Sequence, residues 1–207
     1  MRGVLFTGGD APHKNHVAKW VRDASIIVAA DSGYDAAISF GISPDLVVGD
    51  MDSIGNRGDI ERLPASKVRI FPTDKDFTDT ELGIDALLNA GVDEVVIVGG
   101  GGGRLDHLLG IFALFDRPVH PSVWVSPGAE IYAVDNVWQI DGMLGSTVSF
   151  FPAGLDVCTM ESRGLKWNLN GLTWRKGSAG ISNIATEDRI EVTMRSGRLI
   201  MVHPIEA

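Results

Sequence analysis

The 207-residue sequence has few of the features expected of an exported, disulfide-stabilised or membrane-bound protein. Its single cysteine, Cys158, excludes an intramolecular disulfide framework and a cysteine-based zinc cluster. A membrane-spanning helix needs an apolar run of about 18 residues, and the sequence has none. The first ten residues do not resemble a secretion signal. We therefore expect a cytoplasmic protein that has no membrane partner.

Positive charge is also scarce. The chain has 18 lysines and arginines against 27 aspartates and glutamates, for a formal net charge of −9. This charge repels a phosphate backbone, and no basic stripe compensates for it, so nucleic acid is not an expected partner. A phosphorylated small molecule is compatible with the acidity, because a divalent cation can bridge carboxylates to phosphate oxygens.

The residue pattern divides the chain into two parts. Residues 1–136 alternate apolar, β-branched runs with helical segments, which predicts an α/β domain with a mostly parallel, Rossmann-like sheet flanked by helices. Residues 137–207 consist of short alternating runs separated by glycine, which predicts an all-β sandwich domain. Leu165–Leu169 is one of the strands expected there, and Ser196-Gly197 is expected to form a tight hairpin turn.

Small and acidic residues follow the expected strands of the first part. They are Gly8-Gly9-Asp10, Asp31-Ser32-Gly33, Gly49 to Ser53, Asp74 to Asp76, and Gly99 to Arg104. Ligands of open α/β sheets bind at the carboxyl ends of the strands. We therefore expect these groups to meet in one crevice.

Asp50 and Asp52 are the first candidates for metal binding. On an extended segment, residues two apart point to the same side, so their carboxylates could share one Mg²⁺. The alternative is that they cap a turn through Asx-type hydrogen bonds. Asp76 and Asp79 add carboxylates at the start of a helix whose capping box spans Thr78 to Glu81, and Lys75 offers a cation for phosphate oxygens.

The glycine-rich segment Gly99 to Gly103 is followed by Arg104 and Asp106. Its backbone amides can approach a polyanion closely, and Arg104 can bind phosphate in a bidentate manner. It is neither a Walker A loop, which needs Gly-Lys-Ser/Thr, nor a dinucleotide fingerprint, because Arg104 replaces the third glycine. A tight packing loop is the alternative interpretation.

Trp167 is the most informative residue of the β-rich part. It could stack on a flat heterocycle whose edge Ser182 and Asn183 would hydrogen-bond. The alternative is an ordinary tryptophan of the sandwich core or of an interface.

Taken together, these motifs resemble those of the thiamine pyrophosphokinases, and they occur in the same order over nearly the whole chain. The motifs are Asp31-Ser32-Gly33, Pro44-Asp45, Gly49 to Ser53, Asp74 to Asp79, Gly102 to His107, Gly164 to Trp167 and Ser182-Asn183. The resemblance implies a first domain that binds ATP, as co-substrate, and Mg²⁺, and a second domain that supplies the thiamine pocket. It also implies a homodimer with the active site at the subunit interface.

The resemblance further implies transfer of a diphosphate group from ATP to the thiamine hydroxyl, giving thiamine diphosphate and AMP. It assigns metal binding to Asp50, Asp52 and Asp79, supporting roles to Asp76 and Asp106, and phosphate binding to Arg104. Contacts to ATP are expected from Asp31, Gly33, Lys75, Gly102, Gly103 and Arg104, and contacts to thiamine from Trp167, Ser182 and Asn183. Lys75 replaces the Gln of some relatives, which leaves the nucleotide preference open.

Three other functions use the same residues. One is a diphosphokinase for a different heterocyclic alcohol, such as a pterin. Another is a non-catalytic sensor of nucleotide or thiamine, and the third is a metal-dependent phosphohydrolase.

Overall fold

The computed structural model describes residues 1–55 and 57–205, and it divides the chain into two compact units. Of the described residues, the first unit contains Met1–Ile111 and Pro121–Pro127, and the second contains Phe112–His120 and residues 128–205. Strand β7 (Ala129–Val134), which the sequence analysis includes in the first domain, pairs with strand β14 (Arg198–Pro204) of the second unit.

The first unit is built on a sheet whose strands all pair in parallel, in the order β6-β5-β1-β2-β3-β4. The strands are β1 (Arg2–Thr7), β2 (Ile26–Ala30), β3 (Leu46–Gly49), β4 (Val68–Ile70), β5 (Glu94–Gly99) and β6 (Val123–Ser126). The central strands read as continuous apolar runs because helices cover both faces. This arrangement confirms the predicted α/β class.

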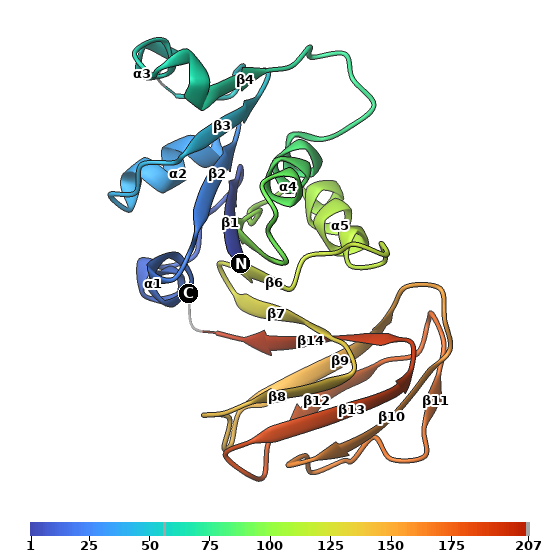
Figure 1. Ribbon diagram of the computed structural model, residues 1–207. Helices are drawn as coiled ribbons and strands as arrows, with labels where there is room; N and C mark the ends of the chain where they lie inside the picture. The colour runs from blue at the N-terminus through green and yellow to red at the C-terminus, as the bar shows by residue number, and fades with distance from the viewer. Residues whose placement is uncertain (56, 206–207) are drawn as a thin grey trace. The chain divides into compact units, whose positions relative to one another are not determined.

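Helices α1 (Lys14–Arg22) and α2 (Gly33–Ser39) lie on one face of this sheet and α4 (Asp79–Asn89) on the other (Figure 1). The remaining helices are α3 (Arg57–Glu61), a 3₁₀ turn at Ala65–Lys67, and α5 (Leu105–Leu114). None of the helices in the described part of the chain is long and apolar enough to cross a membrane.

The predicted capping box fixes the start of α4. The backbone N–H of Thr78 donates to Glu81 Oε2 at 2.7 Å, and the N–H of Glu81 donates to Thr78 Oγ1 at 3.2 Å. These reciprocal bonds satisfy two donors of the first turn. Asp79, the first residue of α4, is thereby held in a defined place above the sheet.

The order of the strands creates a switch point. After β1 the chain builds β2, β3 and β4 on one side, and it then returns to build β5 and β6 on the other. The loops that follow β1 and β5 are joined by two backbone hydrogen bonds between Asp10 and Gly101, of 3.0 and 3.1 Å. Ligands of such sheets bind at these carboxyl ends.

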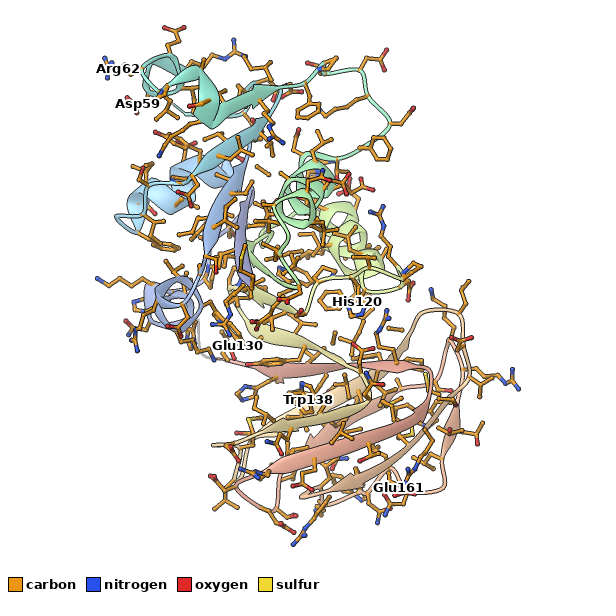
Figure 2. All side chains as sticks on the ribbon, viewed as in Figure 1. Asp59, Arg62, His120, Glu130, Trp138 and Glu161 are labelled. Carbon is orange, nitrogen blue, oxygen red and sulfur yellow. The ribbon has the colours of Figure 1, made fainter. Side chains whose placement is uncertain are left out.

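The second unit contains two antiparallel sheets, which confirms the all-β prediction. One has the order β12-β9-β14-β7 and the other β11-β10-β13-β8. Their strands are β8 (Val137–Ile140), β9 (Thr147–Ala153), β10 (Cys158–Arg163), β11 (Thr173–Trp174), β12 (Gly180–Ile184) and β13 (Ile190–Ser196), with β7 and β14. Trp138 of β8, labelled in Figure 2, contacts Tyr132 of β7 with ring centroids 5.9 Å apart, so the two sheets face each other.

Two local predictions in this unit are wrong. Ser196-Gly197 does not close a hairpin, because β13 pairs with β10 and β8 whereas β14 pairs with β7 and β9. Gly197 has a φ of +68° and carries the chain from one sheet to the other. Leu165–Leu169 is not a strand. It forms one isolated bridge, Leu165 to Ala185, and its buried leucines imitate the alternation of a strand.

Candidate active site

Three carboxylates meet at the carboxyl edge of the first unit's sheet. Asp31 follows β2, Asp50 follows β3, and Asp79 begins α4. One carboxylate oxygen of each lies within 4.8 Å of those of the other two. The ends of two neighbouring parallel strands and the capped end of one helix therefore deliver acidic side chains to one point, and we call these three residues the carboxylate cluster.

A lysine ammonium lies beside the cluster. Lys75 Nζ lies 3.5 Å from Asp50 Oδ2 and 3.3 Å from Asp79 Oδ1, and the Lys75 side chain is only 13% exposed. Even so, within residues 1–55 and 57–205 the buried Oδ1 atoms of Asp31 and Asp79 accept no hydrogen bond of standard geometry, although Lys75 forms an ion pair with Asp79. Buried acceptors in this state are rare. Oxygen ligands of this type suit Mg²⁺, so the residues present fit a divalent cation.

The electrostatics of the cluster differ from one carboxyl to the next. Burial raises the pKa of Asp79, and the charges of Asp50 and Asp31 raise it further against the opposing effect of Lys75. The pKa of Asp50 is lowered, chiefly by the backbone N–H of Asp52 and then by Lys75. Burial alone would lower the pKa of Lys75, but its contacts with Asp79 and Asp50 raise it. Lys75 is therefore an ammonium at neutral pH.

Asp52 is not part of the cluster that the described residues form. Met51 has a φ of +61°, so the segment is not extended. The N–H of Asp52 instead donates to Asp50 Oδ1 at 3.2 Å, which is the Asx-type turn of the alternative interpretation. The exposed Asp52 carboxylate accepts from Ser53 Oγ at 2.8 Å. The third carboxylate of the cluster comes from Asp31, which the sequence analysis predicts as an ATP contact.

The glycine-rich loop after β5 lies over the end of β1. The N–H of Gly100 donates to the carbonyl of Gly8 at 3.0 Å, which joins the two loops. Gly102 has a φ of +101°, and a Cβ added there would lie 3.2 Å from Asp10 Oδ2. A Cβ on Gly103 would meet open space. The loop therefore combines close packing at its base with an exposed, side-chain-free tip.

Arg104 and Asp106 form a two-pronged ion pair beyond this loop. Arg104 Nε donates to Asp106 Oδ1 at 2.9 Å and Nη2 to Oδ2 at 2.6 Å, and the side chains are 70% and 64% exposed. The guanidinium holds the pKa of Asp106 well below its usual range. Exposed pairs contribute little to stability, so Arg104 can exchange this partner for a phosphate at small cost.

Two further predicted residues lie in different surroundings. Asp76 is exposed in the irregular segment before α4. Gly33 is buried at the start of α2, where an added Cβ would lie 2.2 Å from the carbonyl oxygen of Phe6. Its observed role is to let α2 approach β1 closely.

The second unit has a cavity of about 240 Å³. Its lining includes Trp167, Leu169, Leu172, Trp174, Ile181 and Asn183. Trp167 is 54% exposed, and Lys166 Nζ lies 4.4 Å from the centroid of its ring. An exposed aromatic ring beside an apolar cavity suits a flat, partly apolar ligand.

Asn183 holds Trp167 in place. The N–H of Trp167 donates to Asn183 Oδ1 at 3.1 Å, and Asn183 Nδ2 donates to the Trp167 carbonyl at 2.6 Å. Ser182 is exposed with a φ of +59°, within the irregular pairing of β12 and β9, and its N–H donates to Ser149 Oγ at 3.1 Å. The structure thus brings Trp167 and Asn183 together at the cavity, and Ser182 precedes Asn183 in the chain.

Sequence reasoning missed Trp174 and Ile181 in this lining. Gly180 was the available signal, because a Cβ there would lie 2.7 Å from the Trp174 ring. A glycine in a strand often marks close approach by another group.

Comparisons with known proteins agree across both units. Residues 17–124 match the family model "Thiamin pyrophosphokinase, catalytic domain" and residues 137–199 match "Thiamin pyrophosphokinase, vitamin B1 binding domain". The chain is 28% identical to the thiamine pyrophosphokinase of Bacillus subtilis (strain 168), over 96% of each chain.

Solved structures show the same fold. A crystal structure of thiamine pyrophosphokinase from Bacillus subtilis has a TM-score of 0.84 and 25% identity, with both chains fully covered. The thiamin pyrophosphokinase of Candida albicans has a TM-score of 0.75 at 18% identity, over 99% of this chain and 90% of that one. The two matched regions follow the parallel and antiparallel parts of the fold. This chain therefore belongs to the thiamine pyrophosphokinase family, whose members make thiamine diphosphate from thiamine and ATP.

Proposed function

We propose that this protein transfers the diphosphate group in one direct displacement, in which the thiamine hydroxyl attacks the β-phosphorus of ATP and AMP leaves. The observation that carries the proposal is the carboxylate cluster at the carboxyl edge of the parallel sheet, in which the buried Oδ1 of Asp31 accepts no hydrogen bond from the described residues. Phosphoryl transfer of this kind depends on positioning and on stabilisation of charge. No covalent intermediate on the protein is needed.

Asp31, Asp50 and Asp79 would hold Mg²⁺ through their carboxylate oxygens. The cation, when bound, neutralises negative charge on the triphosphate and on the leaving group. The chain supplies the rest of the charge balance. The exposed amides of Gly102 and Gly103 can donate to phosphate oxygens, and Arg104 can do so once it leaves Asp106.

The cavity beside Trp167 is the proposed thiamine site. Trp167 would stack on a thiamine ring, with Ser182 at the rim, and Asn183 would act as a positioning residue through the Trp167 backbone. At about 240 Å³ the cavity is smaller than the roughly 300–1,000 Å³ typical of ligand sites. This supports a homodimer whose subunit interface completes the active site. Light scattering would measure the mass of the particle.

We also propose that the protein acts in the cytoplasm. The one cysteine, Cys158, is buried as a free thiol, which suits a reducing compartment.

Product analysis tests the proposed reaction. Purified protein is incubated with ATP, thiamine and Mg²⁺, and AMP, ADP, thiamine monophosphate and thiamine diphosphate are separated. We expect equimolar AMP and thiamine diphosphate, both lost when Mg²⁺ is removed. ADP with thiamine monophosphate would contradict direct diphosphate transfer.

The same assay separates the alternatives. If AMP formed only with another heterocyclic alcohol, such as a pterin, that alcohol and not thiamine would be the substrate. ATP binding without AMP would indicate a sensor, and steady phosphate release without an acceptor would indicate a phosphohydrolase.

A further inference from the structure

Lys75 occupies a central position in the carboxylate cluster. Its ammonium is 3.5 Å from Asp50 and 3.3 Å from Asp79, the same carboxylates that would bind a divalent cation. The side chain is 13% exposed and those of Asp50 and Asp79 are 10% and 26% exposed, so water screens the contact poorly. Lys75 therefore places a positive charge of the protein itself at the proposed cation site.

The ammonium satisfies the cluster incompletely. Among the described residues, the buried Oδ1 atoms of Asp31 and Asp79 accept no hydrogen bond of standard geometry, although Lys75 is close to the latter. One ammonium carries a single charge opposite three carboxylates. The cluster thus retains both charge and acceptor atoms for a second, stronger cation.

Lys75 is also placed so that it can move. It lies between β4 and α4, in the segment 71–78, which has no helix or strand. Its neighbours Thr73, Asp74, Asp76 and Phe77 are exposed. The four-carbon stem can change rotamer without breaking an element of the fold, and the capping box holds Asp79 independently.

We propose that Lys75 is a tethered cation that holds Asp50 and Asp79 together before the divalent cation binds, and that binding displaces its ammonium. The inference rests on the proposed cation site. Lys75 contacts two of the carboxylates that would hold the divalent cation, and the two positive charges would repel each other, so the bound cation would displace the ammonium. Displacement leaves Lys75 close to the cluster, where phosphate oxygens of ATP would become its partners. Lys75 thereby sets the affinity of the cluster for the cation.

The competing role for Lys75 is that of a permanent support that keeps the carboxylates in place for the cation. The two roles predict opposite changes when the charge is removed. A displaced lysine weakens cation binding, so its removal strengthens binding. A permanent support aids cation binding, so its removal weakens binding.

Thermal unfolding over a series of Mg²⁺ concentrations, without ATP or thiamine, separates these roles. The variant is Lys75→Met, which keeps the apolar stem and removes the charge. We expect its Tm without divalent cation to fall, and the Mg²⁺ concentration for half-maximal stabilisation to fall by about five- to tenfold. At saturating Mg²⁺ the difference in Tm between variant and wild type should narrow.

Lys67→Met is the matched control. It removes the same charge from a lysine whose ammonium donates to the carbonyl of Pro44 at 3.4 Å, and it should leave the Mg²⁺ midpoint unchanged. Lys75→Arg keeps the charge and should stay near the wild-type midpoint. An unchanged or higher midpoint for Lys75→Met would overturn the proposal, as would no stabilisation of any form by Mg²⁺. Because no substrate is present, these outcomes are independent of the product analysis that tests the proposed reaction.

Discussion

Gly49 lies against Asp79 at the centre of the carboxylate cluster. A Cβ added to Gly49 would be 3.1 Å from Asp79 Oδ1 and 3.3 Å from Asp31 Cβ. Gly49 also has a φ of +136°, a backbone conformation that residues with a side chain rarely adopt. The last residue of β3 is thus required to be small both by its backbone and by its neighbours.

Gly49→Ala should therefore damage both stability and activity. Backbone strain at such a position costs on the order of 1–3 kcal/mol, and the methyl group would push Asp79 and Asp31 apart. Urea unfolding and the rate of thiamine diphosphate formation measure the two effects. Gly41→Ala is the control, because Gly41 has a φ of +77° with nothing near its Cβ position. If Gly49→Ala were as active as this control, the packing argument would be wrong.

Replacement of Asp50 and of Asp52 by asparagine should have different effects. Asp50 offers a carboxylate oxygen to the cluster, so Asp50→Asn should lower kcat by about 100-fold or more. The backbone N–H of Asp52 donates a hydrogen bond to Asp50, and Asp52→Asn leaves this bond intact. The kcat of Asp52→Asn should therefore fall by less than about tenfold. Steady-state assays at saturating Mg²⁺ measure both. Equal losses would restore the Asp52 carboxylate as a direct ligand.

Asp79→Asn should stabilise the protein at neutral pH when no divalent cation is bound. Burial raises the pKa of Asp79, so the folded state holds this proton more tightly than the unfolded state. Stability from this group is fully present below about pH 4 and is lost as pH rises through the raised pKa. The neutral amide avoids that loss, so the variant should have a higher Tm than the wild type.

Thermal unfolding in EDTA at pH 7.5 and at pH 4.5 measures this effect, which should shrink at the lower pH. The variant should also lose stabilisation by Mg²⁺ and lose turnover. A lower Tm than wild type at pH 7.5 in EDTA would mean that the contact with Lys75 outweighs burial.

Asn183→Ala should weaken thiamine binding more than it slows the reaction. The substitution removes the partners of both the N–H and the carbonyl of Trp167, at a cost of about 1–3 kcal/mol for an unsatisfied buried group. We expect a higher KM for thiamine with little change in kcat. Asn168→Ala is the control in the same cavity, since the Asn168 side chain accepts a local hydrogen bond from the backbone N–H of Asn170. Equal KM values for the two variants would contradict the positioning role of Asn183.

The sequence was sufficient where local chemistry determines structure. The reciprocal bonds of Thr78 and Glu81 depend on residues three apart, and the order of apolar runs determined the parallel strands of the first unit. The meeting of Asp50 and Asp79 followed from the rule that strand ends share one edge.

Two features of the site depend on backbone conformation at single residues. Met51 has a φ of +61°, so Asp50 to Asp52 form an Asx-type turn where the sequence pattern predicts an extended segment. Asp31 has a φ of +47° at the end of β2, and its entry into the cluster was not foreseen. The hairpin predicted at Ser196-Gly197 is absent because β13 and β14 pair in different sheets, and the sequence does not show which sheet a strand joins.

An anomalous difference map from crystals soaked in Mn²⁺, which prefers the same oxygen ligands as Mg²⁺, tests the proposed cation site directly. We expect a peak bounded by carboxylate oxygens of Asp31, Asp50 and Asp79, with Lys75 Nζ moved away from Asp50 and Asp79. A peak at Asp52 or at Asp106, or no peak near the carboxylate cluster, would contradict it.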